Sequence, residues 1–159
     1  MKRPHILLSC AWLLHTAAWL LPVVKGGTQL PHGLPGWEAW RVSFAAVWPY
    51  EGASFDAWYW AVLSTVSAVT TLFFVLGSPL VILRGSHSLL RASAWVAASA
   101  FVINSYWYIF FGSDRASLRI GYFVWWLSFM FLAVGLFDSA RLGRVDEVDE
   151  NRAVTATST

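Results

Sequence analysis

Three hydroxyl side chains at helical spacing in one apolar stretch are the first residues that could contribute chemistry. Ser64, Ser67 and Thr71 are three and four residues apart, so a helix would place them on one face. His15 and Asn104 lie deep inside two other apolar stretches. Polar side chains at that depth need a partner, and they are candidates for a proton relay, a ligand contact or a packing role. We interpret all five as intramembrane polar sites, with hydrogen-bonded packing as the leading interpretation of His15.

Histidine could also bind a haem or a metal ion, because its ring titrates near neutral pH and is a common metal ligand. A haem inside a membrane normally needs two axial ligands, and no other apolar stretch contains a histidine. Cys10 is the single cysteine, which excludes an internal disulfide and a zinc site of the finger type. The sequence therefore predicts no metal site and no cofactor.

Catalytic motifs are absent from the sequence. It contains no HExxH, GxSxG or CxxC pattern and no glycine-rich phosphate loop. Glu38, Glu51 and Asp56 are scattered among predicted turns, and Asp114 and Arg115 fall in the short turn GSDR. We therefore predict that the protein is not an enzyme and has no catalytic residues.

The composition indicates where such polar residues must sit. Of 159 residues, 57% are hydrophobic, only 13% are charged and eleven are tryptophan. A soluble domain of this size needs more polar surface to stay in solution. The lipid bilayer is therefore the predicted partner, and no interaction with nucleic acid is expected at a net charge of +2.

Four apolar stretches are long enough to cross a membrane, because a hydrocarbon core of about 30 Å takes roughly 17–25 helical residues. None contains Asp, Glu, Lys or Arg. Backbone polar groups in lipid must be satisfied internally, so each stretch is expected to be an α-helix. The predicted fold is all-α, a bundle of four transmembrane helices within residues 1–137, with spans at about 6–24, 58–83, 92–111 and 120–137.

The first stretch is longer than the apolar core of a signal peptide, and no small-x-small cleavage site follows it. We therefore expect it to stay in the protein as a span. Four spans place both termini on one side, and that side carries seven basic residues against four on the other. This bias predicts termini in the cytoplasm. The polar tail, residues 138–159, is predicted to be disordered.

Each predicted span has a seam of small or polar residues at a spacing of three, four or seven. Small residues let helices approach closely in lipid, and hydroxyls bond across the interface. Packing is the predicted role of these seams, with Leu, Phe and Trp facing lipid. The seams are Ala11, His15, Ala18 and Pro22; Ser64, Ser67, Thr71 and Ser78; Ser93, Ala97, Ala100, Asn104 and Tyr108; and Gly121, Ser128 and Gly135.

The stretch GWEAWRVSFAAVW, residues 36–48, is rich in tryptophan but too polar to cross a membrane. On a helix, Trp37, Trp40, Phe44 and Trp48 fall within an arc of about 80°. Tryptophan is favoured where one end of the ring is apolar and the other is wet. This predicts a short extracytoplasmic helix in the membrane interface, with the four aromatic residues as its anchor. A tryptophan platform for a sugar or a quaternary amine is the alternative.

The segment GWEA, Gly36–Ala39, follows the first span and a loop rich in proline and glycine. In this respect the chain resembles a family of small, uncharacterised bacterial integral membrane proteins with four helices, in which a Gly-x-Glu pair precedes the second span. Their two further spans are joined by a basic cytoplasmic turn similar to RGSHSLLR, residues 84–91. The resemblance covers roughly residues 6–110. The resemblance implies this topology and no activity. The location that we predict is a bacterial cytoplasmic (inner) membrane.

Two functions remain open on the sequence alone. The first is an accessory, scaffold or interaction subunit, whose partners are other membrane proteins or a second copy of the chain. The alternative is a small transporter or channel for a solute, with a path lined by Ser64, Ser67, Thr71 and Asn104. A transporter is expected to hold an ion-coupling carboxylate within a span, and the four stretches contain none.

Overall fold

The computed structural model describes residues 3–25, 32–44, 55–110 and 112–157 of the chain. These residues are almost entirely helical, which confirms the predicted all-α class. The exception is a two-stranded antiparallel ribbon, in which β1 (Pro22–Val24) pairs with β2 (Leu34–Pro35). Trp48 and Glu51, two residues singled out from the sequence, lie outside the described part of the chain.

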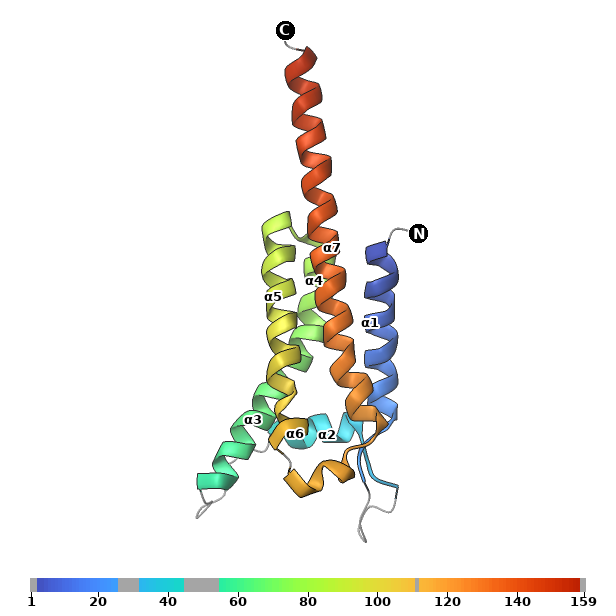
Figure 1. Cartoon of the computed structure of the whole chain (residues 1–159), viewed down its shortest axis with the longest axis vertical. Coiled ribbons are helices and arrows are strands. Elements are labelled where there is room, and N and C mark those ends of the chain that lie inside the picture. The colour runs from blue at the N-terminus through green and yellow to red at the C-terminus, as the bar shows by residue number, and fades with distance from the viewer. Residues whose placement is uncertain (1–2, 26–31, 45–54, 111, 158–159) are drawn as a thin grey trace.

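The long helical segments stand side by side as a bundle (Figure 1). Helix α7 packs along both α1 and α5, and α3 continues through a π-helical segment into α4. Both α1 and the far end of α7 reach one end of the bundle, which we call the terminal end. The segments are α1 (Arg3–Leu20), α3 (Phe55–Leu72), the π-helix Phe73–Gly77, α4 (Ser78–Arg84), α5 (His87–Asn104) and α7 (Ile120–Thr157).

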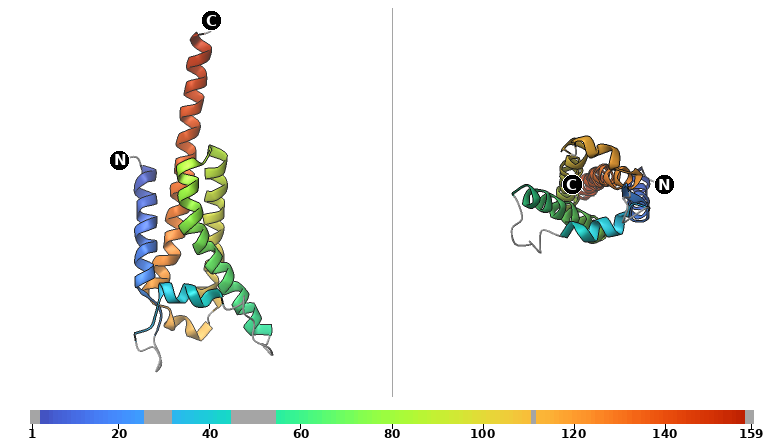
Figure 2. Two further views of the ribbon diagram at one scale, coloured as in Figure 1. Left: turned by 180° about the vertical axis from the view of Figure 1, so that it is seen from behind. Right: turned by 90° about the horizontal axis from the view of Figure 1, so that it is seen from below.

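The short elements gather at the opposite end of the bundle, which we call the α2 end. Helix α2 (Gly36–Val42) lies across this end, and α6 (Tyr106–Phe110) and a 3₁₀ turn (Gly112–Ser117) lie beside it (Figures 1 and 2). The ribbon also bonds to the segment that precedes α7, since Lys25 N donates to Ser117 O and Arg119 N donates to Val23 O at 2.8 Å. Backbone hydrogen bonds therefore tie together the described segments of the α2 end.

The first helix ends earlier than the sequence predicted. A helix through Val24 was expected, but α1 stops at Leu20 and residues 22–24 form β1. Pro22 has no backbone N–H to donate and its ring disfavours the preceding helical turn, so the helix cannot continue through it. The freed carbonyl of Leu21 instead accepts a hydrogen bond from Gly36 N at 3.1 Å.

The helix that runs from α3 into α4 continues through Pro79, because a π-helical turn precedes the proline. Residues Phe73–Gly77 form a π-helix directly before α4, in which the proline occupies the first turn. A wider turn relieves the clash between a proline ring and the preceding carbonyls. The hydroxyl of Ser78 donates to the carbonyl oxygen of Phe74 at 2.6 Å, which satisfies one acceptor at the distortion.

The C-terminal segment is helical where the sequence predicted disorder. Helix α7 continues without interruption to Thr157, and its 38 residues correspond to a length of about 57 Å. It extends well past the other helices at the terminal end (Figure 1). The region contains no proline, and opposite charges stand three residues apart at Arg144 and Glu147 and at Asp149 and Arg152, a spacing that favours helix.

The predicted seams are buried between the helices. Their members on α1, α5 and α7 pack closely, with Ala11, Ala97 and Ser128 fully buried. Gly135 leaves room for Leu8 of α1, because a Cβ at this glycine would lie 2.9 Å from the Leu8 side chain. Among the described seam residues, Pro22 and Ser64 are half-buried, and Tyr108 is 43% exposed.

Two of the four predicted spans meet a simple test of length and apolarity. Among the described residues, Trp58–Arg84 and Ile120–Leu142 are long and apolar enough to cross a membrane. Helices α1 and α5 have only 18 residues each. Their first turns contain Arg3 and His5, and His87 and Arg91, which lowers the mean hydropathy over a helix of that length.

Gly121 tests the contact between α7 and the ribbon. A Cβ at this position would lie 2.7 Å from the carbonyl oxygen of Pro22 and 2.8 Å from that of Leu21, so the backbone would have to move. We expect Gly121→Ala to lower the free energy of unfolding in detergent by about 1–3 kcal/mol, as overpacking usually does. Ile120→Ala is the control, because that side chain is 58% exposed. Equal stabilities for the two variants would contradict the contact.

Candidate functional site

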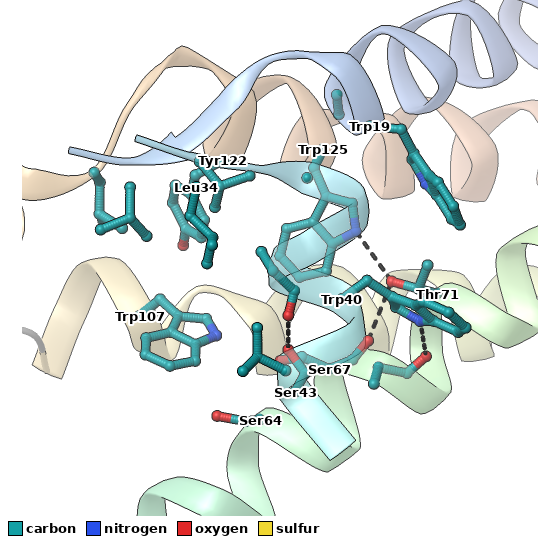
Figure 3. A pocket seen from close by; sticks show the side chains of 18 residues that line it. Trp19, Leu34, Trp40, Ser43, Ser64, Ser67, Thr71, Trp107, Tyr122 and Trp125 are labelled. Atoms are coloured by element: carbon teal, nitrogen blue, oxygen red, sulfur yellow. Dashed lines mark hydrogen bonds between the residues drawn. The ribbon is translucent and has the colours of Figure 1, made fainter. Parts of the chain in front are cut away.

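A pocket of about 240 Å³ lies at the α2 end, enclosed by α1, α2, α3, α7 and the ribbon (Figure 3). Most of its wall is apolar, and none of the described residues that line it is charged. Val42 lines it and is 52% exposed, so the pocket reaches the surface beside α2. Its hydroxyl-bearing residues are Ser43, Ser64, Ser67, Thr71 and Tyr122, and its indole-bearing residues are Trp19, Trp40, Trp107 and Trp125.

The three hydroxyl residues predicted on α3 come together on one wall of this pocket. Figure 3 shows Ser64, Ser67 and Thr71 along α3, with Leu34, Tyr122 and Trp125 on the opposite side. Ser64 Oγ donates to the carbonyl oxygen of Trp60 at 2.8 Å, and Thr71 Oγ1 donates to that of Ser67 at 3.2 Å. Bonds of this kind satisfy the hydroxyl hydrogen within its own helix. The hydroxyl oxygens stay at the pocket wall.

Asn104 does not line the pocket but holds its wall in place. Ser67 Oγ donates to Asn104 Oδ1 at 2.6 Å, and Asn104 Nδ2 donates to Thr70 Oγ1 at 2.9 Å. The hydroxyl of Tyr122 donates to the backbone carbonyl of Asn104 at 2.9 Å. Asn104 is fully buried and therefore ties α3 to the end of α5 through its side-chain amide and α7 through its backbone carbonyl. Thr70 was not singled out from the sequence, although it lies three residues from Ser67.

The aromatic wall was not predicted, because tryptophan was expected to face lipid. Trp125 Nε1 donates to Thr71 Oγ1 at 3.1 Å, and Trp126 Nε1 donates to the carbonyl oxygen of Phe101 at 2.7 Å. The ring of Trp126 also stacks on that of Phe101, with centroids 4.6 Å apart. The sequence did contain a pattern that indicates a buried aromatic face on α7. Its residues Tyr122, Trp125 and Phe129 are three and four positions apart, as in the predicted seams.

The predicted interfacial anchor divides into an outer and an inner part. Trp37 is 46% exposed, and the guanidinium of Arg41 lies 5.9 Å from its ring centroid. Trp40 points inward, stacks on Trp19 at 5.7 Å, and donates from Nε1 to the carbonyl oxygen of Ala68 at 3.3 Å. Phe44 meets Trp40 edge to face. Helix α2 ends at Val42 within the predicted range 36–48, and residues 45–48 are outside the described chain.

Ser43 closes α2 against α3 next to the pocket. Its hydroxyl donates to the carbonyl oxygen of Ala39 at 2.7 Å. Its own carbonyl oxygen lies 3.1 Å from Thr65 Oγ1, whose one hydrogen is shared with the carbonyl oxygen of Ala61 at 3.0 Å. With the Trp40–Ala68 bond, this gives α2 two polar attachments to α3. Ser43 carried no signal in the sequence beyond its position within the tryptophan-rich stretch.

His15 belongs to a separate buried cluster, closer to the terminal end. Its Nδ1 lies 3.0 Å from Ser128 Oγ, and its ring stacks on Phe74 with centroids 3.9 Å apart. Ser128 donates its single hydrogen to the carbonyl oxygen of Trp125, so Nδ1–H of His15 is the donor to Ser128. Nε2 of His15 is buried and has no hydrogen-bond partner. His15 therefore does not join the hydroxyl residues at the pocket.

The described residues contain no group of three or more His, Cys, Asp or Glu side chains that could hold a metal ion. The chain matches no protein-family model, no curated protein and no solved structure. The similarity to bacterial four-helix membrane proteins therefore stays a prediction from the sequence.

Asn104 offers a direct test of the polar network. We expect Asn104→Leu to lower the free energy of unfolding in detergent by about 1 kcal/mol, because two side-chain bonds between helices are lost. Val102→Leu is the matched control, since Val102 is 66% exposed on another face of α5. If both variants unfold like the unmodified protein, the amide contributes nothing to the association of α3 with α5.

Proposed function

We propose that the protein is a multi-pass integral membrane protein in which all four long helical segments cross the bilayer. The observation that carries this proposal is the distribution of polarity. Leu20, Leu83 and Val102 are 66–80% exposed on the outside of the bundle, whereas His15 and Asn104 are at most 2% exposed. Water would favour the reverse arrangement, and lipid favours this one.

The same distribution supports membrane crossing by α1 and α5, the two shorter segments. Leu13 of α1 is 71% exposed and Trp95 of α5 is 60% exposed, both near the middle of their helices. The charged residues of α1 and α5, Arg3 and Arg91, lie toward the terminal end, where Arg3 Nε meets Asp138 Oδ2 of α7 at 3.1 Å. A helix with charges at its end and apolar side chains outward along its middle suits a bilayer with polar headgroups at that end.

Within the membrane, the protein is proposed to act without catalysis, as an accessory, scaffold or interaction subunit of a membrane assembly. Its buried polar groups largely bond to one another, as a packing role requires. The far part of α7 extends beyond the bundle, where it is available to a soluble partner (Figure 1). By the excess of basic residues, this end faces the cytoplasm of a bacterial cell.

A small transporter is the second candidate, because Ser64, Ser67 and Thr71 line a pocket. A solute path from the pocket to the terminal end would have to pass Phe74, which lies one turn beyond Thr71. The ring of Phe74 packs on that of His15, both residues are at most 2% exposed, and Phe129 lies against Phe74. This aromatic layer favours binding in the pocket over conduction through the bundle.

The proposed topology predicts a clear pattern for reporter fusions. An enzyme reporter that is active only outside the cytoplasm should give signal when fused after Gly33, because this position lies at the α2 end. Fusions at Ser86 and at the C-terminus should be silent, and a reporter active only inside should show the opposite pattern. Outside activity at the C-terminal fusion would overturn the orientation.

The two candidate functions give different results with the purified protein. An accessory subunit should retain defined partner chains after crosslinking in cells and purification in mild detergent, and truncation after Asp138 should remove those that contact the extended part of α7. A transporter should instead move a solute across liposomes that contain this chain alone. Solute flux that Thr71→Phe abolishes would replace the accessory role with transport.

A further inference from the structure

We propose that the pocket at the α2 end binds one neutral, largely apolar molecule that carries a hydroxyl group. This inference rests on the membrane location proposed above, and it names the class of ligand that the pocket would take.

The size of the pocket sets the scale of the ligand. A dry cavity of roughly 150 Å³ lined by Leu, Ile and Phe is enough to bind benzene. The pocket here is about 240 Å³, so a fused two-ring molecule or a branched terpenoid chain fills it better than a single ring. Trp40 and Trp125 line it from different helices and offer flat apolar faces to such a molecule.

The wall of the pocket excludes a charged ligand. None of its described lining residues is charged, and the ion pair of α2, between Arg41 and Glu38, lies outside the lining. A carboxylate or an ammonium group buried there would lose its hydration without gaining a counter-charge. The ligand is therefore neutral, in contrast to the quaternary amines that a tryptophan platform could have bound.

The hydroxyl groups of the wall favour a donor on the ligand. Each of the five hydroxyl groups that line the pocket already donates its one hydrogen within the protein. The indole N–H groups of Trp40 and Trp125 are donated as well. A hydroxyl oxygen has two lone pairs, so the serine oxygens can still accept. A ligand hydroxyl can donate to them, whereas an ether or ester oxygen finds no such partner at the serine wall.

Ser43 and Ser64 allow the requirement for a donor on the ligand to be tested without disrupting helix packing. Ser43 Oγ and Ser64 Oγ each donate to a carbonyl four residues earlier on their own segment, at 2.7 and 2.8 Å. Replacing both with alanine removes two acceptors from the pocket, and the bonds lost to Ala39 and Trp60 lie within single segments of the chain. Ser67 is unsuitable for this purpose, because its hydroxyl also holds Asn104.

The experiment compares 2-naphthol with 2-methoxynaphthalene, which share a ring system and differ in the donor. Binding to the full chain in lipid nanodiscs is measured by calorimetry, and empty nanodiscs of the same lipid give the partitioning background. We expect 2-naphthol to bind about tenfold more tightly after this correction, as one buried hydrogen bond allows. Equal affinities for the two probes would overturn the requirement for a donor.

Variants separate the pocket from the rest of the protein. Ser43→Ala with Ser64→Ala should remove most of the preference for 2-naphthol and leave binding of 2-methoxynaphthalene unchanged. Ala39→Phe, which fills the pocket from α2, should abolish binding of both probes. Val102→Phe, on the exposed face of α5, should change neither. Binding that survives Ala39→Phe would place the site elsewhere and refute the proposal.

Two sources could supply such an alcohol, and a competition experiment distinguishes them. Displacement of 2-naphthol by farnesol, but not by farnesyl methyl ether, identifies an alcohol dissolved in the bilayer. Retention of 2-naphthol against farnesol identifies a small ring alcohol from the aqueous phase. Failure of the membrane proposal is recognised separately, because the chain would then not co-purify with the nanodiscs before any probe is added.

Discussion

The buried amide of Asn104 is the interaction on which the arrangement of the helices depends. Helix α7 meets α1 and α5 along their lengths, so these three helices are held by continuous packing. The lower part of α3 leans away from the others (Figure 1). Its polar attachment to α5 consists of Ser67 and Thr70 bonding to Asn104, and Tyr122 of α7 bonds to the backbone of the same residue. Without this junction the pocket would lose its hydroxyl wall.

The π-helix at Phe73–Gly77 places an aromatic layer next to the pocket. It lets the helix that runs from α3 into α4 continue through Pro79 and brings the fully buried ring of Phe74 onto the ring of His15. His15 is part of this aromatic layer, and its Nδ1 bonds to Ser128 of α7. The pocket, with Ser64 and the residues that follow it on α3, lies on the side of the layer toward the α2 end. A single distortion in one helix thus sets a packed aromatic layer beside a cavity.

The spacing of small residues in the sequence identified the buried faces of the helices. It did not identify the aromatic side chains that pack against those faces. Small residues at three-and-four spacing, such as Ala97 and Ala100, are buried because only small side chains let helices approach closely. Phe and Trp were assigned to lipid by their apolar character alone. Trp125 turns inward instead, beside Tyr122, because each carries a donor that lipid cannot satisfy and a buried oxygen can.

The structure also differs from the prediction at the end of the first span and in residues 36–48. Both differences have local causes that a search for apolar stretches overlooks. Such a search counted Pro22 as part of a span, although proline cannot extend the helix and the segment pairs with β2 instead. It treated the tryptophans of residues 36–48 as one anchor, although α2 crosses the end of the bundle and so presents Trp37 outward and Trp40 inward. The inward tryptophan joins α2 to both α1 and α3, because its ring stacks on Trp19 and its N–H reaches the Ala68 carbonyl. Trp40 therefore fastens the short helix over the end of the bundle, and it leaves between that helix and α3 a space that the side chains of the described residues do not fill.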